Sequence, residues 1–397
     1  MSPITSASKK SRVLLLLGIL MIATTLRSTF TGAAPLLDMV RDALALSTAQ
    51  TGLMTTLPLL AFAIVSPLAA GCARRFGTER TLFAAMLVIC AGVLLRSAGH
   101  VALLYIGTSV IGSGIAICNV LLPSLLKRDF PDQVAKLTGA YSLTMGVSAA
   151  AASAIVVPIA MHGFGWSGAM LSLIIFPILA MIVWLPQLRS KTPVNLSGNP
   201  ALHNRGIWRS PLAWQVTLYT GINSLIYYVI VGWLPSILIS HNYNEAQAGS
   251  IHGLLQLATA IPGLFIGLVL SRMKDQSRVA VLMSMLWCIS ALGLWLMPDF
   301  SSLWVFIGGF GSGAGLILGL SLIALRTSSA HQAAALSGMA QSVGYLLAAF
   351  GPPVMGKLHD VSGSWSLPLM LCALLAIVMA VFGAFAGRQI ELGPDGK

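Results

Sequence analysis

The chain has 397 residues, of which 56% are hydrophobic and 9% are charged, and its mean hydropathy is +0.86. Soluble domains carry about 25% charged residues, so this composition excludes a soluble globular domain and predicts a polytopic helical membrane protein. The formal net charge of +12 invites a nucleic-acid partner, but the basic residues gather between apolar segments, and this placement excludes one.

Twelve apolar runs are long enough to cross a bilayer as helices, which takes about 20 residues. In chain order they cover about residues 13–37, 50–70, 81–98, 101–123, 134–160, 166–186, 212–239, 247–271, 279–298, 301–325, 332–357 and 365–386. The five cysteines are scattered in or beside these runs and show no disulfide or metal-ligand spacing, so we expect no metal and no cofactor.

Lysine and arginine are distributed unequally between the two sides of these predicted spans. With the N-terminus placed in the cytoplasm, 19 of the 23 basic residues fall in cytoplasmic segments. This excess is the positive-inside signal that orients membrane proteins. It predicts that both termini are cytoplasmic and that the lipid bilayer surrounds the spans.

Arg27 lies inside the first span, roughly 21 Å from Val13 along a helix that rises about 1.5 Å per residue. None of the 11 carboxylates lies inside a span to pair with it. Because an arginine at mid-membrane costs roughly 2.5–3.5 kcal/mol on insertion scales, Arg27 should face a hydrated, protein-lined cavity and anchor an anionic or strongly dipolar ligand. Arg96, near the outer end of the third span, is expected to extend its side chain to the interface.

The two halves of the chain repeat each other. Gly112-Ser113-Gly114 returns as Gly311-Ser312-Gly313 after 199 residues, and further matches follow in the same order. Six spans return each half to its starting side, so the repeats are parallel, which is the plan of the major facilitator fold. We therefore expect an all-α protein with six-helix bundles at residues 1–186 and 212–397, joined by a cytoplasmic linker at residues 187–211.

The loop at residues 71–80 resembles the motif between helices 2 and 3 of the major facilitator superfamily, which is built on Asp-Arg-x-Gly-Arg. The residues that fit it, and for which the resemblance implies a gating role, are Arg75, Gly77 and Arg80. Arg74 stands where the motif has Asp, which alters the family's ion pair and leaves Glu79 as a candidate substitute. A plain cluster of topological charges is the alternative interpretation.

Three further stretches carry a closer resemblance: residues 24–35 (TTLRSTFTGAAP), 137–142 (LTGAYS) and 329–345 (SAHQAAALSGMAQSVGY). They look like the cyanate/2-nitroimidazole transporter family, with the 2-nitroimidazole branch the nearer one. The resemblance covers about residues 13–388. It implies twelve helices, alternating access in the bacterial inner membrane and a small polar solute as partner, and we expect a monomer.

Polar residues in the spans of the second half complete the predicted site. The 200-residue offset places Tyr227 at the position equivalent to Arg27, and Asn223 lies four residues earlier on the same helix face. Intramembrane polar residues face the bundle interior, and transporter sites lie at the repeat interface. The predicted substrate-binding residues are Arg27, Asn223, Tyr227, Gln256, Gln341 and Tyr345. Each also has a structural interpretation, as a helix-bridging polar group or a packing aromatic.

This set of side chains favours a small planar solute. Arginine donors match nitro or carboxylate-like oxygens, and tyrosine and amide groups supply flat walls, donors and acceptors. A 2-nitroimidazole-type compound fits best; cyanate or another small anion, and export of a broader range of drugs, are the alternatives. The chain has no catalytic motif and no loop long enough for a sensor's output domain, so we expect neither an enzyme nor a sensor.

Energy coupling is open at this stage. Many proton-coupled relatives place Asp or Glu in a span, and this chain has neither there. His252 is the only mid-span group that titrates near neutral pH, so it is the candidate for gating and for coupling to protons. Substrate protonation, uniport and exchange are the alternatives. Asn119, near the inner mouth, is a further gating candidate.

Overall fold

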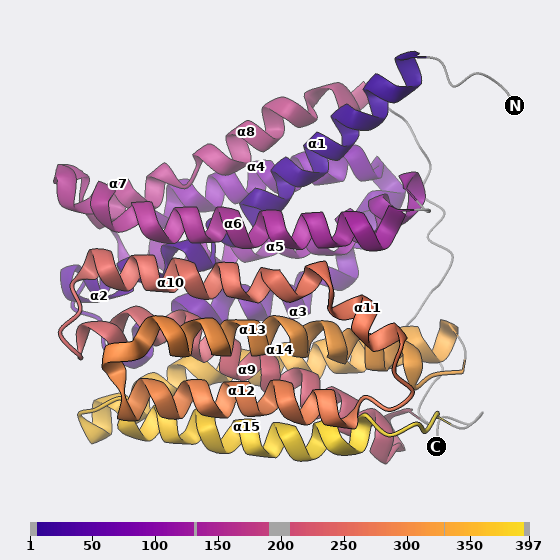
Figure 1. Ribbon diagram of the computed structural model, residues 1–397. Helices are drawn as coiled ribbons and strands as arrows, with labels where there is room; N and C mark the ends of the chain where they lie inside the picture. The colour runs from indigo at the N-terminus through magenta and orange to yellow at the C-terminus, as the bar shows by residue number, and fades with distance from the viewer. Residues whose placement is uncertain (1–5, 131–132, 190–206, 329, 393–397) are drawn as a thin grey trace, which may run out of the picture.

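A computed structural model describes residues 6–130, 133–189, 207–328 and 330–392. Every regular element in these ranges is a helix, which confirms the all-α prediction. The long helices run side by side along one common direction (Figure 1). This arrangement lets each helix satisfy its own backbone hydrogen bonds inside a bilayer.

The first half of the chain forms α1 (Ser6–Ser28), η1 (Thr31–Leu36), α2 (Leu37–Ala43), α3 (Thr48–Phe76), α4 (Thr78–Arg96), α5 (Val101–Asp129), α6 (Val134–Ile159), η3 (Ala160–Phe164), α7 (Gly165–Ser172), α8 (Ile175–Trp184) and η4 (Leu185–Arg189). The second half forms η5 (Ile207–Arg209), α9 (Pro211–Ile239), α10 (Glu245–Ala260), η6 (Ile261–Leu264), α11 (Ile266–Ser271), α12 (Ser277–Leu296), η7 (Pro298–Phe300), α13 (Ser301–Leu325), α14 (Ala330–Ser362) and α15 (Ser366–Ala386).

Length and apolar composition alone qualify nine stretches of the described chain as membrane spans. One of them, Leu137–Leu188, is 52 residues long and holds both α6 and the α7–α8 pair. The α10–α11 pair and α14 are not among the nine. With these included, the helices form the twelve predicted transmembrane segments.

Two of the predicted spans are broken where proline stands inside them. The first ends its α-helix at Ser28 and continues through η1, which contains Pro35, into α2. The eighth breaks at η6 near Pro262, which lacks the amide hydrogen that a continuing helix needs. Breaks at membrane depth are tolerated where protein covers the freed backbone groups. All residues of η1 are buried, whereas η6 buries Pro262 and leaves Leu264 and the adjoining Phe265 exposed.

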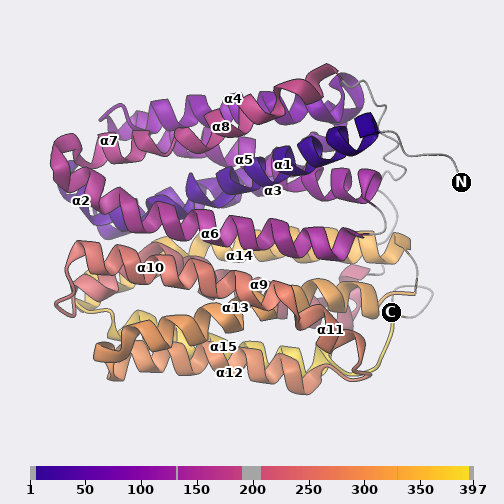
Figure 2. The same cartoon turned by 45° about the horizontal axis from the view of Figure 1, so that its top comes forward.

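The bundle has two ends, which we name by the segments they carry. The linker end holds the described flanks of the linker, residues 189 and 207, together with the start of α1 and the end of α15. The first and last residues that the structure describes lie toward this end (Figure 2). The far end holds the turns at residues 44–47, 97–100 and 240–244. Because each half has an even number of spans, six, the chain leaves each half at the end where it entered.

Each half buries its own apolar core. The core of the second half contains Trp233 and Trp287, whereas those of the first half contain Trp184 and Met170. The halves meet along a seam in which α3 packs on α14 and α6 packs on α10. Figures 1 and 2 both show α6 beside α10.

The seam is tightly packed at the far end. A Cβ atom added to Gly52 on α3 would lie 3.0 Å from the Pro353 Cα atom on α14, and one added to Gly356 would lie 3.1 Å from the Thr48 backbone. Only glycine permits such close backbone approach. Trp233 Nε1 donates to the Pro352 carbonyl at 2.8 Å, which satisfies that carbonyl beside the contact.

Toward the linker end the same two helices offer free space. A Cβ atom added to Gly71 on α3 or to Gly338 on α14 would meet nothing within 4 Å. The α6–α10 side stays closer, since a Cβ on Gly139 would lie 3.2 Å from the Gly263 carbonyl oxygen. Between α3 and α14, the described glycines thus lie in close contact at the far end and have no such contact toward the linker end.

Candidate functional site

The break in the first span sets the position of Arg27. Arg27 lies in the last turn of α1, and three hydroxyl groups around it bond to backbone carbonyls: Ser28 to Thr24, Thr29 to Thr25 and Thr31 to Arg27 itself. These local bonds replace part of the helix ladder where the backbone leaves the α conformation. The half-buried Arg27 side chain is thereby held at the seam.

Arg27 reaches across the seam to the second half. Its Nη1 atom donates to Thr259 Oγ1 on α10 at 2.8 Å, and its Cζ atom lies 5.4 Å from the centre of the Tyr227 ring on α9. Among the described residues no carboxylate forms an ion pair with it. In the described part of the chain Arg27 thus carries no ion pair, and it contacts a hydroxyl group and an aromatic ring.

Gln256 links Tyr227 to Thr259, the partner of Arg27, and keeps one hydrogen-bond donor unused within the described chain. The Tyr227 hydroxyl donates to Gln256 Oε1 at 3.0 Å, and Thr259 Oγ1 donates to the Gln256 carbonyl at 2.8 Å. Gln256 is fully buried, yet its Nε2 atom has no partner within the described chain. An unsatisfied buried donor costs about 1–3 kcal/mol, which an acceptor on a bound ligand would recover.

Five aromatic side chains from both halves surround this polar group. Phe30 stacks on Tyr228 with ring centres 5.9 Å apart, and Phe62 meets Tyr345 edge-on at 5.6 Å. Tyr227 and Tyr228 also touch, at 5.0 Å. We call these five side chains the aromatic group. Flat rings of this kind are suited to stacking on a planar ligand.

Three predicted binding residues therefore join Arg27, namely Tyr227, Gln256 and Tyr345, and two lie elsewhere. Asn223 is buried inside the second half, where its Nδ2 atom donates to the Ser312 carbonyl at 3.2 Å and its Oδ1 atom accepts from Trp287 Nε1 at 3.1 Å. Its amide already bridges α9, α12 and α13. A binding role for Asn223 stays a prediction that these contacts do not favour.

Gln341 lies one helical turn from Tyr345 toward the linker end. Its side chain is exposed, and its Nε2 atom donates to Ser337 Oγ at 3.1 Å. It therefore stands on the open side of the aromatic group rather than within it. This position is suited to a residue that a solute meets on entry or exit.

His252 ties the halves together on the far-end side of Gln256. It is fully buried; its Nε2 atom lies 3.1 Å from the Val231 carbonyl, and its Nδ1 atom lies 2.9 Å from Ser153 Oγ on α6. Because a carbonyl only accepts, Nε2 carries the hydrogen and Nδ1 accepts from Ser153 in the neutral ring. His252 thus forms a neutral bridge between the halves, and its gating role stays a prediction.

At the junction between α3 and α4, Glu79 forms an ion pair, whereas Arg75 and Arg80 form none within the described chain. Gly77 has φ +89, which side chains rarely adopt. Arg75 and Arg80 are exposed and have no ion pair in the described ranges. Glu79 is buried and accepts from Arg128 Nη2 at 2.9 Å, so this carboxylate does form an ion pair at the linker end, within the first half.

The structure also places Asn119 and Arg96, the two remaining polar residues singled out in the first-half spans. Asn119 is half-buried, and its Oδ1 atom lies 3.5 Å from the Tyr141 hydroxyl, joining α5 to α6. The expected interfacial extension of Arg96 is wrong: the side chain is 2% exposed and donates to the Thr29 carbonyl at 2.9 Å. The break in the first span leaves the Thr29 carbonyl available inside the protein. Arg96 bonds to this carbonyl instead of to water at the membrane interface.

Sequence reasoning missed Phe30, Phe62, Tyr228 and Thr259. Phe30 stands inside the stretch 24–35, and Thr259 follows Gln256 by three residues on the same helix face, so both had a usable signal. Phe62 is one apolar residue in an apolar run, and Tyr228 resembles an interface residue. Only the packing of the two halves assigns these two to the aromatic group.

Comparison with known proteins agrees with this architecture. The model of the family described as Major Facilitator Superfamily matches residues 16–344. The chain is 66% identical to the 2-nitroimidazole transporter of Escherichia coli (strain K12), over 98% of this chain and 99% of that protein. It is 23% identical to a cyanate transport protein of the same organism, over 92% of this chain and 95% of that protein.

Solved structures share the fold. The chain superposes on a D-xylose–proton symporter with TM-score 0.76 and 12% identity, covering 93% of this chain and 97% of that one. It superposes on an inward-facing, occupied bacterial homologue of the lysosomal transporter Spinster with TM-score 0.74 and 16% identity, covering 96% and 97%. At these identities the likeness concerns the fold alone. With its two six-helix repeats and its family match, the chain belongs to the Major Facilitator Superfamily and is a multi-pass membrane transporter.

Proposed function

We propose that the chain moves 2-nitroimidazole-type compounds across the bacterial inner membrane by alternating access. The observation that carries this proposal is Arg27, which the second half holds through Thr259 and Tyr227 without a carboxylate partner in the described chain. The relative that is 66% identical and bears the name of a 2-nitroimidazole transporter supports the choice of solute.

The chemistry of the site matches such a compound. Nitro oxygens accept hydrogen bonds from a guanidinium, the free Gln256 Nε2 donor points to a second acceptor such as a ring nitrogen, and the stacked Phe30 and Tyr228 rings indicate a planar partner. A cationic drug would meet Arg27 with like charge. Cyanate would use the charge but leave the rings without a partner.

The direction of opening follows from the two ends of the seam. We place the linker end in the cytoplasm, because it carries most of the basic residues. Closure at the far end then makes this an inward-facing state. Transport would move the two six-helix units, 1–186 and 212–397, as a monomer, breaking the His252–Ser153 bridge when the far end opens.

The central test is uptake of labelled 2-nitroimidazole into proteoliposomes by wild type and Arg27→Gln. Losing a charged hydrogen-bond donor costs about 1.5–3 kcal/mol, so uptake at subsaturating solute should fall at least about 10-fold. Arg388→Gln, an exposed arginine at the linker end, is the matched control and should transport normally. Equal uptake by the Arg27 and Arg388 variants would contradict the proposal, and uptake of cyanate alone would establish the small-anion alternative.

One further measurement separates the modes of coupling. A flux that an imposed pH gradient leaves unchanged excludes proton coupling and indicates uniport or exchange. A flux that responds in wild type but not in His252→Asn assigns the proton to His252. A response kept in that variant assigns it to the protonated substrate.

A further inference from the structure

A second arginine is buried beside the break in the first span, on the far-end side of Arg27. Arg96 ends α4 and is 2% exposed. Its Nη1 atom donates to the Thr29 carbonyl, but its Nε and Nη2 atoms have no partner within the described residues. No carboxylate of the described chain forms an ion pair with it. A full positive charge is therefore buried with two donors unused.

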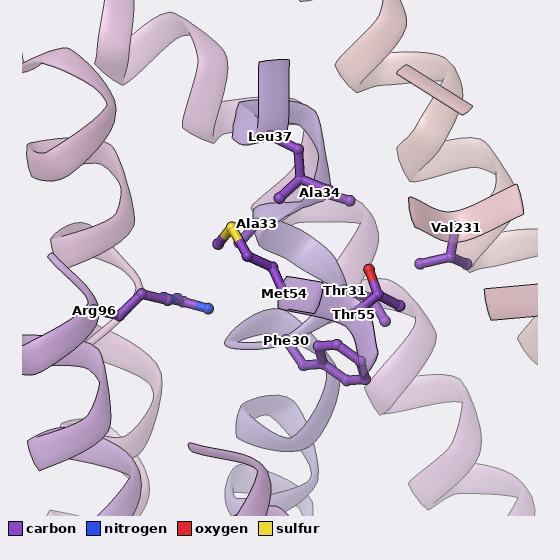
Figure 3. A pocket seen from close by; sticks show the side chains of 9 residues that line it. All are labelled: Phe30, Thr31, Ala33, Ala34, Leu37, Met54, Thr55, Arg96 and Val231. Carbon is purple, nitrogen blue, oxygen red and sulfur yellow. The ribbon is translucent and has the colours of Figure 1, made fainter. Parts of the chain in front are cut away.

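Arg96 lines a small cavity. The cavity has a volume of about 20 Å³ and is lined by Phe30, by η1 and the start of α2, by Met54 and Thr55 of α3, by Arg96 and by Val231 of α9. Figure 3 shows the Arg96 side chain directed from α4 toward Met54 and the residues of η1. One water-sized guest needs roughly 10–15 Å³, so the space holds one such guest.

Charge decides which guest fits this cavity. A water molecule would satisfy the donors but leave the buried charge uncompensated, which is costly in a low-dielectric interior. The Thr55 hydroxyl lines the same cavity and makes no hydrogen bond within the described chain, so it adds a third donor. A guest that accepts from the Arg96 donors and carries negative charge meets the requirements of this cavity, and Thr55 offers a further donor in its wall.

We propose that Arg96, with Thr55 beside it, binds one small inorganic anion of the halide class, at a site next to the solute site and sharing Phe30 with it. The cavity excludes polyatomic carboxylates by size in this state. Because Val231 belongs to the second half and the other lining residues to the first, the complete cavity exists only while the far end is closed. The bound anion therefore stabilises the far-end-closed state.

The test is thermal unfolding of the detergent-solubilised chain in sodium chloride and in sodium gluconate of equal ionic strength. Chloride at about 100 times its Kd should raise the Tm of wild type by about 3 °C, saturably. Arg96→Gln should lose this rise, whereas Arg27→Gln, which leaves the cavity intact, should keep it. An equal rise in wild type and Arg96→Gln, no rise in wild type, or loss of the rise in Arg27→Gln would overturn the proposal.

A second measurement needs no variant. Crystals of wild type grown in sodium bromide should show an anomalous scattering peak beside Arg96 Nε and Nη2. A water molecule at that place, with no anomalous signal, would reject the anion site even if Arg96→Gln failed to fold.

Discussion

At the scale of single residues, the site combines one fixed charge with groups that only donate, accept or stack. Arg27 is restrained by Thr259 and by the Tyr227 ring, so little side-chain freedom is left to lose when a solute binds. The Tyr227 hydroxyl in turn orients Gln256 so that its Nε2 donor stays free. Each of these contacts crosses from one helix to another.

Tyr227→Phe tests the orientation of Gln256. The variant keeps the ring beside Arg27 but removes the hydrogen bond to Gln256 Oε1, which is worth about 0.5–1.5 kcal/mol. The apparent KM for 2-nitroimidazole uptake should rise roughly 2- to 10-fold. Tyr219→Phe is the control: that hydroxyl is buried in the second-half core without a partner in the described ranges, so its loss should leave KM unchanged.

The predictable part of the site is the part marked by polarity. Arg27, Tyr227 and Gln256 stand out as polar residues in apolar spans, and spacing by four places related ones on a common face. Asn223 shows where spacing fails as a guide. Spacing by four places it on the same helix face as Tyr227, but its amide is bonded to residues of α12 and α13. Spacing along one helix cannot predict which neighbour satisfies a polar group first.

At the scale of elements, the break in the first span positions Arg27, and the contact between α3 and α14 closes the seam at the far end. The twelve spans were predictable because bilayer thickness fixes their length. The breaks at η1 and η6 were marked by Pro35 and Pro262, but where the chain turns off the α-helix depends on partners such as Thr259 and Arg96 that lie far away in sequence.

Gly52→Ala tests the far-end contact between α3 and α14. The added methyl group would lie 3.0 Å from the Pro353 backbone and should force the helices apart, at a cost of about 1–3 kcal/mol to the closed state. Uptake in proteoliposomes should fall several-fold. Gly71→Ala makes the same substitution on the same helix where the methyl group meets nothing within 4 Å, and it should transport as wild type does. Equal behaviour of the two variants would show that the contact does not control transport.

At the scale of the whole molecule, the halves are separate packed bodies that meet along one seam. Each has its own core, and Tyr228 and Tyr345 of the second half also pack against the first-half core. The sequence repeat predicts two such bodies and the parallel relation between them. It does not predict which end of the seam is closed, because both states use the same helices.

Labelling of single cysteines tests the proposed inward-facing state. In a background without reactive native cysteines, Gln341→Cys should react with an impermeant maleimide added to the cytoplasmic face of inside-out vesicles, because that side chain is exposed on the open side. Ser236→Cys, buried at the far end, should be protected. Saturating 2-nitroimidazole should slow labelling at position 341. Faster labelling at position 236 than at position 341 would indicate the opposite state.

The division of the site between the halves has a consequence for how tightly solute is held. Arg27, Phe30 and Phe62 come from one half and Tyr227, Tyr228 and Gln256 from the other, so neither half contains the complete site. A chain cut in the linker should bind nothing as separate fragments and recover binding only on reassembly. The affinity for solute then depends on how far apart the two halves lie. A solute that contacts both halves favours the state in which they are close together.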